Sequence, residues 1–202
     1  MSLSSSVRHA ALGLLGIVML GGAAQADSIY VVFENPEAGA LAAKGGATDP
    51  DMAKLGAFEV DTLDFGIENS IVLDPRVGAV GPGRASFPPL TMTLELGPGV
   101  PALTQTSGAG GHYNDVTVHF RTSGTNAVEY ATLSLKLVAV SSVEISASTT
   151  AAPQATVALT YGSMKLDFYP LDAKGVPAKD PVSGQWNAMT GTADYSTIPK
   201  PK

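Results

Sequence analysis

The sequence predicts an all-β protein, a β-sandwich or a small barrel, and three observations carry this prediction. Apolar and polar residues alternate with a period of two in several short segments, as they do in half-buried strands. The chain has 22 Gly and 14 Pro among 202 residues, which suits short strands joined by turns. Only 15% of the residues are charged, so long solvated helices are not expected.

The N-terminal half contains one clear strand and one segment with a change of rhythm. The apolar run 29–33 predicts the first strand, and a loop rich in Ala, Gly, Asp and Pro follows over 35–55, with at most one weak helical turn. Segment 58–67 alternates, but its apolar positions change parity after Val60. We therefore expect either a bulge or a crossing from one sheet face to the other.

The middle of the chain is interrupted by turn-forming residues. Glycine and proline occur so often in segment 74–89 that regular structure is not expected there. Segment 90–96 alternates again and predicts a half-buried strand. Between 98 and 111 the alternation stops, and we expect one short helix over 100–106 with a proline in its first turn.

The C-terminal half gives the clearest strands. Segments 116–121 and 130–137 alternate on either side of a Ser-Gly-Thr-Asn turn and predict an antiparallel hairpin. Another strand begins at Val157, and its parity shifts at Gly162, where a bulge costs little. Trp186 is the last large apolar residue, and burial as a core anchor is favoured for it over ligand stacking.

The first 26 residues have the pattern of a cleaved signal peptide. A weakly basic start precedes an apolar stretch of 11 residues, Ala10–Leu20, and a small-x-small pattern ends at Ala26. We expect cleavage between Ala26 and Asp27 and export to the periplasm or beyond. An uncleaved membrane anchor is disfavoured, because the apolar stretch is short for a bilayer span.

After cleavage we expect one domain over residues 27–195 and a disordered tail over 196–202. Cleavage removes one of 12 basic residues and no acidic residue, which leaves 11 basic against 18 acidic side chains and a net charge of −7. Such a charge argues against a nucleic-acid partner, because binding phosphates requires a basic surface. No later segment is apolar for long enough to predict a membrane span.

Metal and cofactor sites find little support in the sequence. The chain has no cysteine, so disulfides and thiolate ligands are excluded. His112, Asp115 and His119 could be metal ligands, but positions 115 and 119 lie about 13 Å apart on a flat strand. Asp49 and Asp51 lack the spacing of a calcium loop, so turn capping is favoured for them. We predict neither a metal nor a cofactor.

A catalytic site is not predicted either. The chain has no Gly-x-Ser-x-Gly elbow for a serine nucleophile. Gly-Pro-Gly-Arg at 81–84 lacks the Gly-Lys-Ser/Thr end of a phosphate loop. The polar side of the predicted hairpin could line a wet channel, form a subunit seam, or be an ordinary solvated face.

An ordered set of segments resembles the Hcp (haemolysin-coregulated protein) family. Gly-Ala-Thr-Asp-Pro-Asp at 46–51 is similar to the Gly-rich turn near the start of that family. Val-Glu-Tyr at 128–130 and Val-Ser-Ser-Val at 140–143 resemble the family's most recognisable strand. Gly-Gln-Trp-Asn at 184–187 resembles its closing segment, and the resemblance as a whole covers about residues 29–187.

The resemblance implies a β-barrel of two antiparallel sheets with one short flanking α-helix. It also implies a structural protein, not an enzyme, that assembles into hexameric rings and into the tube of the type VI secretion system. Secretion-system components or effectors would be its further partners. A loop after the second strand would reach the neighbouring ring, and its candidate contact residues here are Glu68, Asn69, Asp74, Arg76 and Arg84.

Three features depart from the family pattern. Members normally lack a cleavable signal peptide, whereas this chain begins with the pattern of one, and residues 35–43 are extra length in the first loop. The family's helix-start pattern, with charged Lys and Asp before Ser-Pro, is missing around residues 95–103. The alternative function is therefore an exported periplasmic or extracellular binding module that keeps the fold and has no role in a tube.

Overall fold

The computed structural model describes residues 27–70, 72–74, 79–81, 85–124 and 126–196. The predicted leader, residues 1–26, and residues 197–202 of the predicted tail lie outside the described residues. The strands of the main sheet are β1 (Ser28–Glu37), β2 (Phe58–Val60), β3 (Thr62–Asp64), β8 (Leu90–Glu95), β9 (His112–Arg121), β10 (Glu129–Ser146), β11 (Gln154–Phe168) and β12 (Val182–Asn187).

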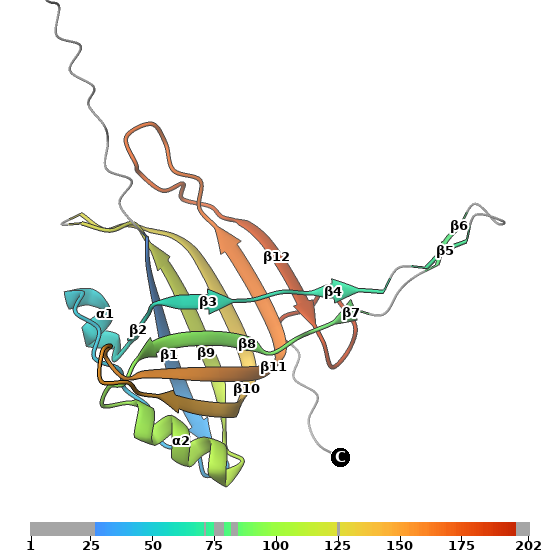
Figure 1. Cartoon of the computed structure of the whole chain (residues 1–202). Helices are drawn as coiled ribbons and strands as arrows, with labels where there is room; N and C mark the ends of the chain where they lie inside the picture. The colour runs from blue at the N-terminus through green and yellow to red at the C-terminus, as the bar shows by residue number, and fades with distance from the viewer. Residues whose placement is uncertain (1–26, 71, 75–78, 82–84, 125, 197–202) are drawn as a thin grey trace, which may run out of the picture.

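These strands form one antiparallel sheet that nearly closes into a barrel (Figure 1). Its order is β2-β1-β9-β10-β11-β8-β3, and β12 pairs with the second half of β11. The two ends of this order, β2 and β3, are consecutive in the chain and are separated by Asp61 alone, whose N–H donates to the carbonyl of Thr93 at 2.8 Å. The predicted all-β barrel is confirmed; its two walls belong to one continuous hydrogen-bonded sheet.

The parity change after Val60 marks the point where the chain crosses from one wall of the barrel to the other. This is the second of the two alternatives that the sequence predicted. β2 pairs with β1 at one end of the sheet, whereas β3 pairs with β8 at the other. Phe58 and Val60 are buried under the first wall, and Leu63 packs against the same core from the second. The crossing therefore joins both walls to one hydrophobic interior.

The predicted hairpin is also confirmed. β9 and β10 pair with Val116 opposite Leu135 and Val118 opposite Leu133, and all four side chains are buried. The parity of β11 shifts at Gly162, but the break in register lies elsewhere, between Val140 and Ser142 of β10. β10 and β11 are long enough to run through both walls, which Figure 1 shows as their bend at the base of the barrel.

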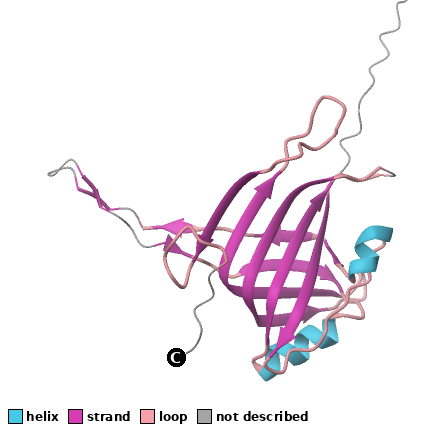
Figure 2. Ribbon diagram, turned by 180° about the vertical axis from the view of Figure 1, so that it is seen from behind, coloured by secondary structure: helices cyan, strands magenta, loops and turns pink. Residues whose placement is uncertain are grey.

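Two helices lie at one end of the barrel (Figure 2). The predicted helix is α2 (Val100–Ala109), three residues longer than expected, and a six-residue helix, α1 (Pro50–Leu55), forms where at most a weak turn was expected. Asp49 caps α1 by accepting the N–H groups of Asp51 and Met52, so the capping interpretation is confirmed. Within the described residues no helix combines the length and apolarity that a membrane span requires.

The predicted irregular segment 74–89 contains short strands, which corrects that expectation. β4 (Glu68–Asn69) pairs with β7 (Ala85–Ser86), and β5 (Val72–Asp74) pairs with β6 (Ala79–Gly81). Gly81 lies within β6 and pairs with Val72, so a glycine of this segment takes part in a paired stretch. We call residues 68–86 the arm.

The extra residues 35–43 are not a loose loop. The first three continue β1, which runs to Glu37 and was predicted to end earlier. The backbone of Leu41 then binds the wall: its carbonyl accepts the hydroxyl of Tyr113 at 2.7 Å and its N–H donates to Thr106 at 3.0 Å. Tyr113 and Thr106 are both buried, so this segment seals the barrel end beside α2.

Arg121 anchors α1 to the end of β9. Its side chain is 8% exposed, and its guanidinium donates to Asp49 at 3.0 Å and to the carbonyl of Ala127 at 2.9 Å. The same carboxylate caps α1, so one ion pair joins the helix, the wall and the β9–β10 turn. A charge that is buried with its partner is costly to leave unpaired.

We expect Arg121→Met to lower the free energy of unfolding by about 2–4 kcal/mol, because Asp49 and the Ala127 carbonyl lose their buried donor. Urea denaturation monitored by circular dichroism measures this change. The control is Lys54→Met, which removes the exposed pair with Asp51 and should change stability by at most about 0.5 kcal/mol. Equal effects of both substitutions would contradict the anchoring role of Arg121.

Asp49 gives this contact a predictable pH dependence. Hydrogen bonds from the N–H groups of Met52 and Asp51, and then the charge of Arg121, hold the pKa of Asp49 below its ordinary value of 3.8, although burial opposes them. Because this pKa is lower in the folded state, the carboxylate stabilises the fold at pH values above the ordinary pKa. This stabilisation is lost as the pH falls through the folded-state pKa. Asp49→Asn keeps a capping side chain without the charge. The difference in the free energy of unfolding between the parent and Asp49→Asn should therefore narrow from about pH 5 to pH 2. Urea denaturation across that range measures it, and a constant difference would contradict this account.

Candidate functional site

The residues predicted to contact a neighbouring ring are spread along the arm. Glu68 and Asn69 are exposed in β4, and Asp74 pairs with Ala79 at the β5–β6 end. Arg76 and Arg84 lie outside the described residues. Figure 1 shows β5 and β6 well beyond the barrel, at the end of the arm. The structure thus brings the described members onto one ribbon but not into one cluster.

The outer face of the barrel wall carries paired charges. Lys136 on β10 donates to Asp115 on the neighbouring β9 at 2.6 Å, and His119 binds Glu129 across the same two strands. On β11, Lys165 pairs with Asp167 at 2.9 Å. Both lysines have an anionic partner within hydrogen-bond reach, so their charges are compensated locally on this polar face.

Three side chains in two of these pairs, Lys136, Lys165 and Asp167, have shifted pKa values. The hydrogen bond to Asp115 raises the pKa of Lys136, and the hydrogen bond to Asp167 raises that of Lys165. Burial alone would raise the pKa of Asp167, but hydrogen bonds from Ser183 and Lys165 outweigh it and hold this pKa below its ordinary value. Lys136, Lys165 and Asp167 therefore remain charged at neutral pH, which suits a stable surface more than acid–base catalysis.

The C-terminal segment, residues 188–196, folds back over this polar face. The carbonyl of Tyr195 accepts the hydroxyl of Ser163 at 2.9 Å, and that of Ala193 accepts the amide of Gln185 at 2.9 Å. The amine of Lys136 lies 5.2 Å from the centre of the Tyr195 ring, a cation–π distance. Burial raises the pKa of Tyr195, although the charge of Lys136 opposes this rise.

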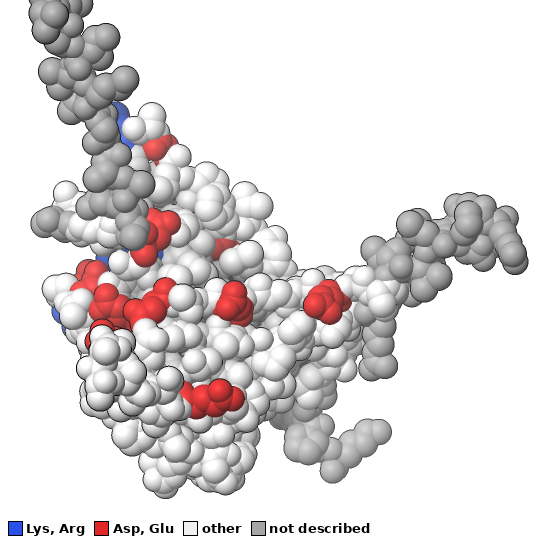
Figure 3. Space-filling view, in the orientation of Figure 1, with Lys and Arg blue, Asp and Glu red and all other residues white. Residues whose placement is uncertain are grey.

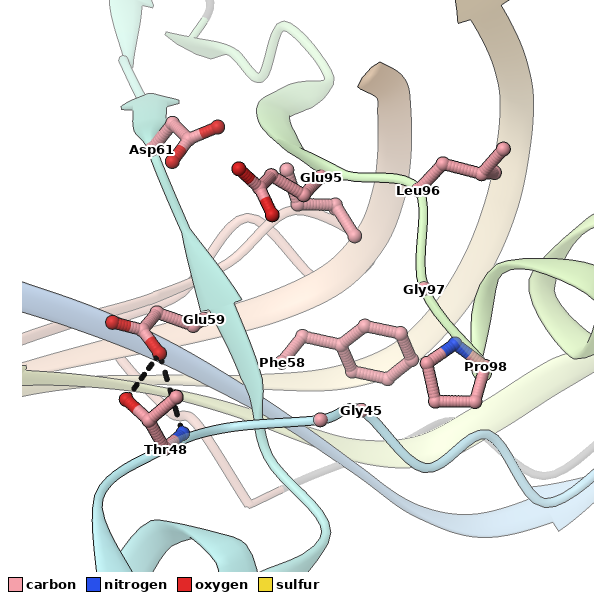
Figure 4. A pocket seen from close by; sticks show the side chains of 12 residues that line it. Gly45, Thr48, Phe58, Glu59, Asp61, Glu95, Leu96, Gly97 and Pro98 are labelled. Carbon is pink, nitrogen blue, oxygen red and sulfur yellow. Dashed lines mark hydrogen bonds between the residues drawn. The ribbon is translucent and has the colours of Figure 1, made fainter. Parts of the chain in front are cut away.

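A hollow of about 360 Å³ opens near the helical end of the barrel, between the loop before α1, β2 and the end of β8 (Figure 4). Glu59, Asp61 and Glu95 line it, and Figure 4 shows the ring of Phe58 directed toward Pro98. The Phe58 ring also lies against Gly99. A side chain does not fit at this position, because a Cβ there would lie 2.3 Å from the ring.

Carboxylates of this acidic hollow bind other parts of the chain. Glu59 accepts the hydroxyl and the N–H of Thr48 at 2.9 and 3.3 Å, and Asp61 accepts the amide of Gln154 at 3.3 Å. Two of its three carboxylates are thus engaged by the chain itself. Figure 3 shows acidic side chains scattered over the face that carries β3 and β8, with basic side chains only at its margin.

The histidines and acids considered as metal ligands have other partners. Asp115 binds Lys136 and Asn35, and His119 binds Glu129, while His112 lies at the start of β9 opposite Glu37. Across the described parts of the chain, no group of three or more His, Asp or Glu side chains is placed to hold a metal ion.

Sequence reasoning missed a groove at the root of the arm. Trp186 packs against the core, as predicted, but it also lines this groove together with Leu166 and Phe87. The alternating pattern of β11 assigned Leu166 and Phe168 to the core face, yet these side chains are 40% and 46% exposed. Alternation carries no signal for this exposure, because it does not show which apolar residues of β11 other parts of the chain cover.

The comparisons with known proteins agree on one family. A family model described as "Type VI secretion system effector, Hcp" matches residues 35–168. A solved structure titled "Structure of a type six secretion system protein" is similar with a TM-score of 0.73 and 19% identity, over 83% of this chain and 99% of that one. The comparison with curated protein sequences found no match.

Two further solved structures have the same fold. The crystal structure of Hcp1 from Salmonella typhimurium gives a TM-score of 0.62 at 17% identity, over 82% of this chain and 97% of that one. Secreted protein Hcp3 from Pseudomonas aeruginosa gives 0.52 at 14% identity, over 80% of this chain and 99% of that one. At these identities the structural likeness establishes the fold.

We expect Tyr195→Ala to release the C-terminal segment from the polar face, because the ring contact with Lys136 and the burial of the ring are both lost. Amide hydrogen exchange at residues 188–193 should become about three- to tenfold faster, while exchange in β9 and β10 stays unchanged. The control is Ser196→Ala, whose side chain bonds to Asp194 within the segment. Unchanged exchange in Tyr195→Ala would show that the ring does not hold the segment.

Proposed function

The chain belongs to the Hcp family of type VI secretion proteins, and from this premise we propose that it is a structural tube protein that assembles with copies of itself. The copies form rings, six to a ring, and the rings stack into a tube. The observation that carries the proposal is the family match over 35–168, together with a barrel of the family's fold. The proposed role is not enzymatic; secretion-system components and effectors are the proposed partners besides the protein itself.

The arm is the segment that we propose for ring stacking. It leaves the barrel between β3 and β8, and its paired ends β5 and β6 extend away from the main sheet (Figure 1). Its proposed contact residues, Glu68, Asn69, Asp74, Arg76 and Arg84, include both signs of charge. A copy of the same protein can therefore offer complementary partners, and complementary charges fix the register of an interface.

The polar face of the barrel wall, which carries the charge pairs on β9, β10 and β11, is the surface that we propose for the inside of the tube. Its charges are compensated locally, by Asp115 with Lys136 and by Lys165 with Asp167. A hydrated wall with little net charge would let protein cargo pass without strong binding of either charge sign. Effectors are accordingly proposed as passing cargo.

A second function is favoured by the leader-like sequence 1–26. An exported binding module with the same fold, in the periplasm or outside the cell, would need this leader and would need no ring. In either case we propose cleavage between Ala26 and Asp27. Recovery of a processed monomer in the periplasm of cells without a secretion machine would favour the module over the tube protein.

We expect the parent protein to form rings at high concentration, and we expect replacement of residues 70–85 by a short turn to weaken ring stacking while the barrel still folds. The strands of the deleted segment pair within the arm, so its loss should leave the circular dichroism spectrum and thermal unfolding nearly unchanged. Size-exclusion chromatography with light scattering and negative-stain microscopy measure the assemblies.

A matched control is a deletion within another exposed loop, residues 172–176, which should leave both folding and stacking intact. A strictly monomeric parent at high concentration would contradict the tube proposal. Unchanged stacking after removal of 70–85 would leave rings in place but exclude the arm as the stacking element.

A further inference from the structure

One part of the polar face is covered by the chain itself. The C-terminal segment, residues 188–196, lies there over two neighbouring cross-strand rows, in which residues of β10, β11 and β12 are register partners. We call this part of the face the covered site, and its residues are Ser134, Lys136, Ser163, Lys165 and Gln185. All five side chains end in a group that can donate a hydrogen bond, so the site suits an occupant that offers acceptors.

The C-terminal segment offers the covered site two main-chain acceptors and one aromatic ring. Ser163 donates to the carbonyl of Tyr195, and Gln185 donates to the carbonyl of Ala193, both at 2.9 Å. The amine of Lys136 lies 5.2 Å from the centre of the Tyr195 ring, within the range of a cation–π contact. The site therefore recognises a peptide by two carbonyls, two residues apart, and by an aromatic side chain.

Tyr195 is the residue of the segment that bridges two strands of the wall. Its carbonyl binds Ser163 on β11, while its ring lies beside Lys136 on β10. Burial raises the pKa of Tyr195, and the charge of Lys136 and a hydrogen bond with Ser134 oppose this rise. The ring is thus partly withdrawn from water by its contact with the polar face, and the contact is lost when the segment leaves.

The two halves of the C-terminal segment are held differently. The first half is a turn built on Asn187, which is 1% exposed: its side chain accepts the N–H groups of Met189 and Thr190, and its main chain pairs with Thr192. Beyond Thr192 the described chain lies in no helix or strand, and Ala193 is exposed. A segment held without a hydrogen-bonded ladder opens more readily than the sheet beneath it. The turn can therefore stay in place while residues 193–196 leave the covered site.

We propose that the covered site is a peptide-binding site that the chain fills with its own C-terminal segment, which thereby competes with a segment of another protein. The partner segment carries an aromatic side chain over Lys136, its own carbonyl on Ser163, and a second carbonyl on Gln185. In the tube this partner is an effector, and this part of the inference rests on the proposed function. The closed segment is then an autoinhibitory cover that keeps the wall from holding cargo.

Peptide binding to the full-length protein tests this competition. The probe is a synthetic peptide of residues 188–196 with blocked ends, added to the parent and to Tyr195→Ala, whose own segment no longer places a ring in the site. We expect Tyr195→Ala to bind the peptide at least about tenfold more tightly than the parent, because a tethered occupant competes at a high effective concentration. Tyr195→Phe keeps the ring and should resemble the parent. Amide chemical shifts in β10 and β12 measure the binding, including weak affinities.

Further substitutions locate the bound peptide. In the Tyr195→Ala protein, Lys136→Met removes the cation beside the ring and should weaken peptide binding about two- to fivefold. Gln185→Met removes a hydrogen-bond donor at an exposed position, so the fold should survive and peptide binding should weaken by a similar factor. The control is Lys174→Met, exposed in the loop between β11 and β12, which should leave peptide binding unchanged. A peptide that itself carries Tyr195→Ala should not bind.

The outcomes separate this inference from the function on which it rests. Equal affinity of the parent and Tyr195→Ala for the peptide, or no binding by Tyr195→Ala at millimolar peptide, would overturn the inference. Tight binding by Tyr195→Phe, or binding that survives both Lys136→Met and Gln185→Met, would also overturn it, because the ring or the covered site would then play no part. None of these measurements requires rings, so such a failure leaves the tube role intact. A parent that never assembles overturns the tube role instead, whatever the peptide does.

Discussion

The barrel depends on the connection between β2 and β3, the two end strands of a single sheet. Asp61 is the one residue between the strand that begins the sheet and the strand that ends it, and its N–H bonds to Thr93 across the gap. Closing a sheet removes edges that would otherwise pair with other chains. Leu166, on the half of β11 that pairs with β12, stays 40% exposed and lines the groove at the root of the arm.

Much of this fold follows from alternation in the sequence. Val116, Val118, Leu133 and Leu135 keep a strict two-residue period and fall on one buried face, and the change of rhythm at Val60 marks the crossing between the walls. Such patterns predict strands well because each residue's burial is set by its immediate neighbours on the pleat. The capping role of Asp49 was equally local, since the carboxylate binds N–H groups two and three residues ahead.

The remaining features depend on distant parts of the chain, and alternation does not encode them. Leu166 and Leu159 look alike in sequence, yet one is 40% exposed and the other is fully buried, because Leu159 packs within the core cluster whereas Leu166 lines the groove. The arm contains many glycines and prolines, and its short paired stretches depend on cross-strand partners that composition does not reveal. The anchoring of α1 likewise requires Arg121, 72 residues from the aspartate that it binds.

The position of Trp186 has an optical consequence. It is the one tryptophan in the chain, and its indole lies where the barrel core meets the groove at the root of the arm. Intrinsic fluorescence excited at the indole therefore reports on this place and on no other. Water reaching the groove shifts the emission to the red, and displacement of that water shifts it to the blue, so the unlabelled protein carries its own spectroscopic probe of the surface that an incomplete barrel leaves open.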